Sequence, residues 1–298
     1  MRSVFDQTYT DWEAVVIDDG STDGTASYLD SVADDRVRVL RHVHCGNPAR
    51  LRNVGIAAAG GAYVAFLDSD DLWFPQKLEV QLEHLLTHPS CGWSYTYVSR
   101  IDEQGDPLTT PPDRQGTPYA GWILERLMTL DAIVTTPAVI VERRLLDAVE
   151  GFDESFVFCQ EHDLWVRLSR ESEVTVVPAV LAAVRSHRGS HTAGRPEVYE
   201  YWVRLYEKIR VSSSEDHIKT LSKRQCAKML VAQAAGYRGA GQYGAARRAL
   251  FRSLHYRWVH GAAWIALVKT WLRPFMPPVA LKIYRSLHGK VRGRGTHV

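Results

Sequence analysis

Acidic residues follow two apolar stretches of this sequence at the points where the stretches end. Two acids end the first and three end the second: Asp18 and Asp19 after "WEAVVI", and Asp68, Asp70 and Asp71 in "AYVAFLDSDDLWFPQKLE". In open parallel α/β sheets, ligands bind beyond the carboxyl ends of the strands. Buried carboxylates are costly without a partner, and Mg²⁺ and Mn²⁺ prefer oxygen ligands. The pattern therefore favours a divalent cation site at one edge of a sheet.

A second interpretation of these acids is also open. Aspartate is common in solvated turns, and an isolated Asp-x-Asp pattern occurs often by chance. The cation interpretation depends on position: a second acid pair follows an earlier strand-like stretch.

The elements that would position these acids alternate along the chain. Residues 12–18, 36–42 and 62–68 have the composition of strands, and residues 25–33, 49–59 and 75–86 have helical spacing. Strand and helix in alternation predict a parallel sheet with right-handed crossovers. Farther along, we expect strands at 91–102, 132–143 and 173–187, a loop at 105–118 and a helix at 161–172. Pro178 favours an edge or a break in the last of these strands.

Composition describes a globular protein with an uneven charge distribution. The 298 residues are 45% hydrophobic and 23% charged. The four cysteines are scattered and form no CxxC pair, which predicts neither a zinc site nor a disulfide framework and favours a reducing cytoplasm. Residues 1–216 hold 20 Lys and Arg against 34 Asp and Glu, whereas 217–298 hold 16 against none. We expect the basic segment to meet something anionic.

Several motifs together resemble the family-2 glycosyltransferases. The resemblance covers about residues 3–192 and is carried by these stretches: "QTYTDWEAVVIDDGSTDGT", "ARLRNVGIAAAGGAYVAFLDSDDLWFPQKLE", "GFDESF", "QEHDLWVRLSR" and "RSHRGSH". It implies a GT-A fold, which is an α/β fold of Rossmann-like type with a mostly parallel sheet flanked by helices. Residues 1–195 would form this domain, and 196–298 would form a basic helical C-terminal extension.

The resemblance also implies roles for individual residues. Asp18 and Asp19 would bind the nucleotide sugar, with Asp19 on the base. Asp70 would ligate Mn²⁺ or Mg²⁺ on the donor diphosphate, with Asp68 beside the ribose or the metal. His187 would lie near the diphosphate and metal, although a surface position suits a histidine in such a loop equally well.

The remaining implied roles concern the acceptor and the helix after the second strand. Glu161 would be the general base and Asp163 the reserve candidate, because this chain reads Gln-Glu-His-Asp where the family has a simpler acidic pair. Glu161 also suits the first turn of a helix for electrostatic reasons alone. Arg52 and Asn53 would steady phosphate or base, or else cap and pack their helix. Residues 151–154 would shape the acceptor wall.

One departure from the family lies at the beginning of the sequence. Family members usually start with a strand and a "PTYN"-like turn, whereas this sequence opens within the following helix, at "SVFDQTY". The resemblance thus implies an N-terminally truncated domain. Either the start is assigned late, or the domain has lost donor binding.

The function implied is an inverting, metal-dependent transfer of a sugar from a nucleotide-diphosphate sugar to a lipid-linked or polysaccharide acceptor. The alternative is a catalytically inactive GT-A domain that acts as a membrane- or partner-binding module. No nucleic-acid motif accompanies the basic segment, and no GxGxxG follows the first strand, so nucleic acid and dinucleotide cofactors are not expected. Sequence leaves the oligomeric state, the sugar and the acceptor unknown.

The basic segment predicts a location for the protein. Residues 258–294 place aromatic and aliphatic residues at helical spacing among Lys and Arg, and no apolar run reaches the length of about 20 residues that spans a bilayer. Packing against the rest of the protein explains part of this pattern. An amphipathic helix surrounded by basic residues suits an anionic membrane surface. We therefore expect a cytoplasmic protein that is peripheral at the inner face of the membrane.

Overall fold

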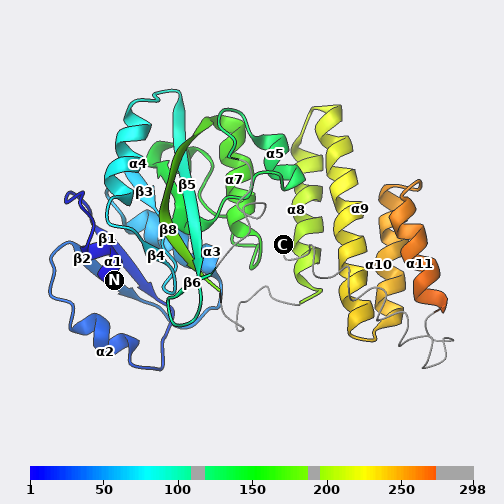
Figure 1. Cartoon of the computed structure of the whole chain (residues 1–298), viewed down its shortest axis with the longest axis horizontal. Coiled ribbons are helices and arrows are strands. Elements are labelled where there is room, and N and C mark those ends of the chain that lie inside the picture. The colour runs from blue at the N-terminus through cyan, green and yellow to red at the C-terminus, as the bar shows by residue number, and fades with distance from the viewer. Residues whose placement is uncertain (109–117, 187–194, 273–298) are drawn as a thin grey trace. The chain divides into compact units, whose positions relative to one another are not determined.

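A computed structural model of the chain describes residues 1–108, 118–186 and 195–272 (Figure 1). The chain divides into two compact units, Met1–Ala193 and Gly194–Val298. We refer to them as the N-terminal unit and the C-terminal unit, and each is described by itself. His187 and residues 273–294, which carry two of the predictions above, lie outside the described residues.

The N-terminal unit mixes strands and helices along its whole length. In chain order its elements are α1 (Arg2–Phe5), β1 (Ala14–Asp18), α2 (Thr25–Asp30), β2 (Val37–Arg41), α3 (Pro48–Ala58), β3 (Tyr63–Ala65), β4 (Leu72–Trp73), α4 (Lys77–Leu86), β5 (Cys91–Ile101), β6 (Pro107–Leu108), α5 (Leu124–Thr129), the 3₁₀ turn η2 (Thr136–Ala138), β7 (Val139–Glu142), α6 (Arg143–Ala148), α7 (Gln160–Glu171) and β8 (Glu173–Arg185).

The strands form two sheets, and the larger one is mixed. Strands β1 and β2 pair in parallel, and the other sheet has the order β3-β7-β5-β8-β4, with β6 on β5. Within that sheet, β5 and β8 are parallel, whereas the other described pairs are antiparallel. The prediction of a mostly parallel sheet was therefore wrong. The predicted parallel pairing is present at β1–α2–β2, where two strands flank one helix. The later strands pair with strands that are distant in sequence, and the local sequence pattern does not determine the direction of those pairings.

The centre of the larger sheet is the most deeply buried part of the unit. Trp93 on β5 and Trp165 on α7 are fully buried, and their rings stack with centroids 5.9 Å apart. Strand β8 lies between β5 and β4, and its pairing with β5 skips from Val177 to Val180. Pro178 therefore occupies an irregularity inside the sheet and not an edge, which suits a residue without a backbone N–H.

The C-terminal unit is helical as far as it is described. Its helices are α8 (Val198–Ser212), α9 (Asp216–Gly239), α10 (Tyr243–Tyr256) and α11 (Gly261–Leu272). Each helix packs on the next one along the chain (Figure 1). Within the described residues, none of the helices combines the length and the apolar character needed to cross a bilayer.

Candidate active site

The acidic loop after β3 leads directly into β4, which fixes its far end in the core. The amide of Asp71 donates to the carbonyl of Asp68 at 3.1 Å, which closes a tight turn. Strand β4 then pairs with β8, and the indole of Trp73 donates to the carbonyl of Pro137 at 2.9 Å. Trp73 is buried, so it packs beneath the loop and does not offer its ring to a sugar.

The three acids of this loop differ in their surroundings. Asp68 and Asp70 are partly exposed, whereas Asp71 is buried and accepts the backbone N–H of Arg185 at 2.9 Å. Burial raises the pKa of Asp71 to about 6, and the charges of Asp70 and Asp68 add to this rise. Negative charge is therefore concentrated in the loop, and Asp68 and Asp70 are the carboxylates that solvent or a ligand can reach.

Arg185, the last residue of β8, holds the loop from the other side. Its Nε donates to the carbonyl of Asp70 at 2.9 Å and its Nη1 donates to the carbonyl of Asp102 at 2.7 Å. Sequence reasoning did not single out this residue. The available signal was its place at the end of a strand-like stretch, immediately before Ser186 in the "RSH" motif.

Arg52 on α3 joins the acidic loop to the helix that carries the predicted base. Its Nη2 lies 2.6 Å from Oδ1 of Asp68. Its other terminal nitrogen, Nη1, is buried and has no hydrogen-bond partner in the part of the chain that the structure describes. An unsatisfied buried N–H group is costly, so this nitrogen is a natural contact for an anionic ligand.

Glu161 lies in the first turn of α7 and within electrostatic reach of this pair. Burial raises its pKa, the positive charge of Arg52 opposes the rise, and the negative charge of Asp68 adds to it. The structure thus pairs Arg52 of α3 with Asp68 of the loop after β3, and it places Glu161 of α7 within electrostatic range of both. A carboxylate with a raised pKa is a stronger base, which suits proton abstraction.

Asp163, the reserve candidate, has a different environment. It is 1% exposed, and its Oδ2 accepts from Nε of Arg167 at 2.8 Å, one helical turn away. Its neighbour His162 is buried, with Nε2 3.1 Å from the carbonyl of Leu127, and burial lowers the pKa of this imidazole to about 4. These contacts give Asp163 and His162 structural partners on the buried side of α7.

The acid pair after β1 builds the turn and the loop beside it. Asp18 accepts from the amide and hydroxyl of Ser21, and these bonds lower its pKa. Asp19 accepts from the amides of Cys45 and Gly46 at 2.8 and 2.9 Å. Burial alone would raise the pKa of Asp19, but these two hydrogen bonds outweigh it and lower the pKa.

The carboxylate of Asp19 therefore anchors the loop that leads into α3. Both of its oxygens have partners in this chain, and a nucleotide base would share them with the loop. Asn53, which was also predicted to bind the donor, contacts Phe152 and Glu154, as described below.

The acidic loop suits a divalent cation only together with a ligand. Among the described residues, no group of three or more His, Cys, Asp or Glu side chains is arranged to hold a metal ion. Mg²⁺ typically binds proteins through one or two carboxylates plus substrate phosphates, not through an all-protein cage. The two accessible carboxylates, Asp68 and Asp70, fit this kind of site. Their negative charges also contribute to the raised pKa of the neighbouring Asp71.

Comparison with known proteins places this arrangement in a family. Residues 1–131 match the family model described as Glycosyl transferase family 2. Residues 1–131 of the chain belong to glycosyltransferase family 2. The chain is 40% identical over 179 residues to the UDP-Glc:alpha-D-GlcNAc-diphosphoundecaprenol beta-1,3-glucosyltransferase WfgD of Escherichia coli, over 59% of this chain and 66% of the relative.

Other relatives are longer than the matched region. The chain is 42% identical over 110 residues to the Bacillus subtilis (strain 168) glycosyltransferase TuaG, named for teichuronic acid biosynthesis. That match covers 36% of this chain and 43% of TuaG. Matches to two Rickettsia glycosyltransferases span 28% and 32% of those proteins. The chain thus spans less than half the length of several relatives.

A solved structure supports the fold. The mannosyltransferase PcManGT from Pyrobaculum calidifontis, in complex with GDP-Man and Mn²⁺, superposes with a TM-score of 0.57 and 17% identity, over 94% of this chain and 76% of that one. The predicted GT-A fold is confirmed, with a mixed sheet in place of a mostly parallel one.

Proposed function

We propose that this chain transfers a sugar, with inversion, from a nucleotide-diphosphate sugar to a hydroxyl group of a lipid-linked or polysaccharide acceptor. The observation that carries the proposal is the ion pair of Arg52 with Asp68, an accessible carboxylate, within electrostatic range of Glu161, whose pKa burial raises. The names of relatives support the substrate classes, because WfgD is named for UDP-Glc and a diphosphoundecaprenol-linked sugar.

The donor side of the site must neutralise a leaving diphosphate. Asp70 and Asp68 would hold Mn²⁺ or Mg²⁺ against the donor, where the cation acts as a Lewis acid. Arg52 would give its unpaired Nη1 to the donor's phosphate while Nη2 stays on Asp68. The neighbour PcManGT was solved with GDP-Man and Mn²⁺, which supports a cation at this loop.

The acceptor side needs a base. Glu161 would accept the proton of the acceptor hydroxyl. The hydroxyl oxygen would at the same time attack the anomeric carbon from the face opposite the leaving diphosphate. One in-line displacement then inverts the anomeric centre. Asp163 is held by Arg167 and buried, so it would orient α7 and take no proton.

The test compares two neutral replacements on α7. Glu161→Gln should lower sugar transfer by about 100-fold or more, since a general base typically contributes 10²–10⁴-fold, while Mn²⁺-dependent binding of UDP or GDP is retained. Asp163→Asn should instead lower the thermal stability through loss of the buried ion pair. The assay offers a panel of UDP- and GDP-sugars with a GlcNAc-diphosphoundecaprenol acceptor.

Two results would contradict the proposal. A large loss of transfer in a stable Asp163→Asn variant, with Glu161→Gln active, would move the base to Asp163. A wild-type chain that neither transfers nor hydrolyses any donor in the presence of Mn²⁺ would favour the inactive binding module instead.

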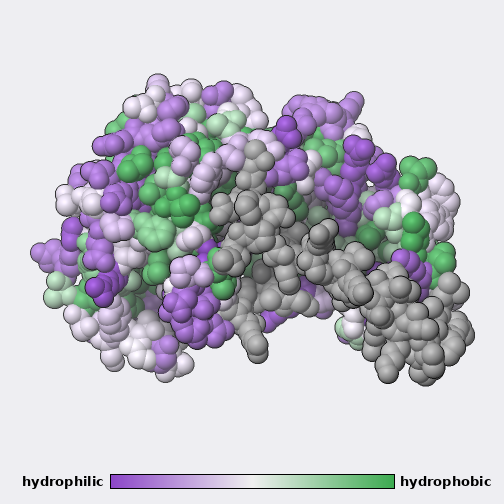
Figure 2. All heavy atoms as spheres, viewed as in Figure 1, coloured by the Kyte–Doolittle hydropathy of each residue, from purple (hydrophilic) through white to green (hydrophobic). Residues whose placement is uncertain are grey.

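We further propose that the C-terminal unit docks this enzyme on an anionic membrane at the cytoplasmic face. Helix α11 buries Ala263, Ala266, Leu267 and Thr270 and leaves an opposite stripe exposed: Trp264, Ile265, Val268 and Trp271. Figure 2 shows hydrophobic residues at the surface of this unit around α10 and α11. The charge of residues 217–298, with 16 basic residues and no acid, is complementary to anionic lipid.

A further inference from the structure

The carboxamide of Asn53, on α3, binds the turn that precedes α7. Its Nδ2 donates to the carbonyl of Phe152 at 2.9 Å and to Oε1 of Glu154 at 3.0 Å, and its Oδ1 accepts the amide of Phe152 at 2.8 Å. A carboxamide has two N–H donors and one oxygen. Both donors are therefore used within the chain, and none is left for a nucleotide or phosphate.

The turn is shaped to receive this side chain. Gly151 has a φ of +62°, and a Cβ atom there would lie 2.7 Å from Oδ1 of Asn53. Both the left-handed backbone and the close approach require glycine. A second asparagine, Asn47 at the beginning of α3, donates to the carbonyl of Glu154 at 2.8 Å. Helix α3 thus holds residues 151–154 at several points.

The same turn touches the donor side of the site. Phe152 is buried, packs edge-on against Phe66 with ring centroids 5.3 Å apart, and lies under the guanidinium of Arg52 at 5.5 Å. Along the chain, the turn leads into α7 and hence to Glu161. A shift of residues 151–154 would therefore move the acceptor wall and the base relative to Arg52.

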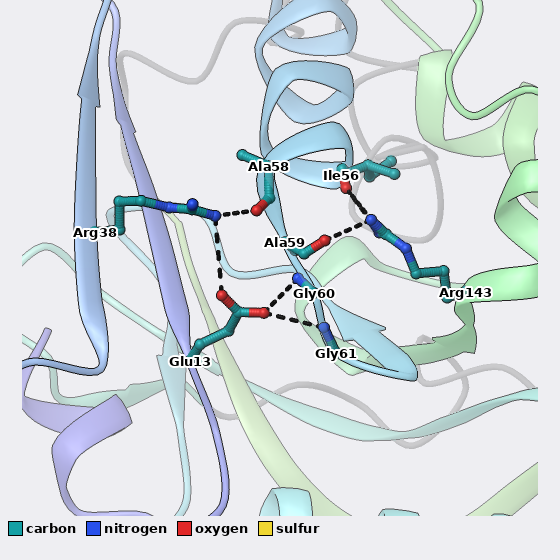
Figure 3. A network of polar contacts seen from close by, with 8 residues as sticks. All are labelled: Glu13, Arg38, Ile56, Ala58, Ala59, Gly60, Gly61 and Arg143. Carbon is teal, nitrogen blue, oxygen red and sulfur yellow. Dashed lines mark hydrogen bonds and ion pairs between the residues drawn. The ribbon is translucent and has the colours of Figure 1, made fainter.

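The C-terminal end of helix α3 is held in place by side chains from other elements, which fixes the helix that carries Asn53 (Figure 3). Arg143 donates to the carbonyls of Ile56 and Ala59, and Arg38 donates to the carbonyl of Ala58. Glu13 accepts the amide of Gly61 at 3.0 Å and also that of Gly60. The carbonyls of Ile56 and Ala58, two of those that the end of the helix leaves unpaired, thus have partners.

We propose that Asn53 is a positioning residue for the acceptor half of the site and not a ligand of the nucleotide sugar. It sets residues 151–154, and through them Glu161, at a fixed place relative to Arg52. This inference rests on the proposed transfer reaction, and it revises the donor-binding role predicted for Asn53 from the sequence.

A reciprocal exchange of Asn53 and Glu154 tests the contact. Asn53→Asp places a carboxylate against the carboxylate of Glu154 and the carbonyl of Phe152. We expect kcat for transfer to fall, and KM for the acceptor to rise, by about 10-fold or more in kcat/KM. Binding of UDP or GDP with Mn²⁺ should stay within about twofold of wild type.

A second substitution, at position 154, supplies the N–H donor that Asn53→Asp removes. In the double variant Asn53→Asp/Glu154→Gln, the new amide at position 154 can donate to the new carboxylate at position 53, so most of the lost kcat/KM should return. Glu154→Gln alone is the matched single variant: its carbonyl oxygen still accepts from Asn53, so hydrogen exchange at 151–160 should stay at the wild-type level, and the recovery of kcat/KM in the double variant is measured against it. Hydrogen exchange of the amides at 151–160 should rise in Asn53→Asp and return in the double variant.

These readouts separate this inference from the proposed function. If wild type transfers no sugar, the reaction is wrong, whereas the exchange measurement still tests the contact. A fall in nucleotide affinity in Asn53→Asp with no recovery in the double variant would restore Asn53 as a donor ligand. Unchanged kinetics and exchange in Asn53→Asp would overturn the positioning role. If Asn53→Asp does not fold, Asn53→Ser removes both amide donors without adding charge.

Discussion

Asp68, Asp70 and Asp71 are close in sequence, but the structure gives them different work. Asp71 is buried beneath Arg185, Asp68 is paired with Arg52, and Asp70 is half-buried at the tip of the loop. Asp70→Ala should therefore abolish Mn²⁺-dependent turnover of the donor while leaving the melting temperature nearly unchanged, because the substitution removes an oxygen ligand and little packed volume. Donor hydrolysis and calorimetry measure the two effects.

The exposed acid Asp106 provides the control for Asp70. Asp106→Ala should retain full metal-dependent turnover. If Asp70→Ala remains active, or if Asp106→Ala loses activity to the same extent, the assignment of Asp70 to the cation is wrong.

Lys77 is a buried charge that the proposed reaction does not use. Its side chain is fully buried, its Nζ lies 4.5 Å from the ring centroid of Trp73, and it has no hydrogen-bond partner among the described residues. Burial lowers its pKa from 10.5 to about 7. Between these two pKa values the unfolded chain binds more protons than the native one, so stability rises with pH from about 7 to 10. Below pH 7 Lys77 is protonated in both states, and the whole free-energy cost of burying its charge is present.

Lys77→Met should accordingly raise the melting temperature at pH 7, by the equivalent of a few kcal/mol at most, since one pKa unit corresponds to about 1.4 kcal/mol. The advantage over wild type should shrink as pH approaches 10. Calorimetry from pH 6 to 10 measures it, with the partly exposed Lys219→Met as control. A destabilised Lys77→Met variant would show that the ammonium group is needed in the fold.

The sequence predicted the location of the site residues better than it predicted their binding partners. Acids at strand ends indicated the loop of Asp68, and the resemblance to family-2 glycosyltransferases indicated Glu161. The partners of Asn53 and Asp19 could not be predicted, because they are backbone groups of loops distant in sequence. Arg185 was missed for the same reason: it binds backbone carbonyls.

Helices and long strands were predicted more reliably than short elements. Strands β1, β2 and β5 and helices α3 and α7 lie within a residue or two of their predicted ranges. Strand β4, with two residues, and helices α5 and α6, with six each, were not predicted, since such short segments show no periodicity. The expected strand at 132–143 is reduced to β7 because residues 136–138, with Pro137 at the centre, form a 3₁₀ turn.

The clamp on α3 predicts a contrast between two adjacent arginines. Arg143 binds two carbonyls at the end of α3, whereas Arg144 forms an exposed ion pair with Glu142 (Figure 3 shows the former). Arg143→Leu should destabilise the chain by about 1–3 kcal/mol, because it leaves buried carbonyls unpaired. Arg144→Leu should cost no more than about 0.5 kcal/mol. Chemical denaturation measures both variants, and equal losses would show that the clamp contributes no stability.

The chain as a whole separates its charges between its two ends. Acids gather in the N-terminal unit, where they serve the site and its loops, and residues 217–298 carry basic residues and no acid. The proposed chemistry needs carboxylates, and the proposed membrane contact needs basic residues. If the two were mixed on one surface, the carboxylates would weaken the attraction to anionic lipid. Their separation along the sequence leaves residues 217–298 as a continuous segment that an anionic surface attracts.

Membrane docking makes a prediction for the intact chain with a matched pair of substitutions. Val268 is exposed on α11 within the apolar stripe, and Val211 is exposed on α8, outside it. Wild type should float with vesicles that contain anionic lipid at low salt and release as salt rises, because each basic residue near such a surface contributes about 1 kcal/mol that salt screens. Val268→Asp should weaken flotation by about 10-fold or more, since it puts a carboxylate into the lipid-facing stripe, whereas Val211→Asp should float like wild type. Flotation that is equal for the two variants, or that does not depend on anionic lipid, would show that α11 faces something other than a membrane.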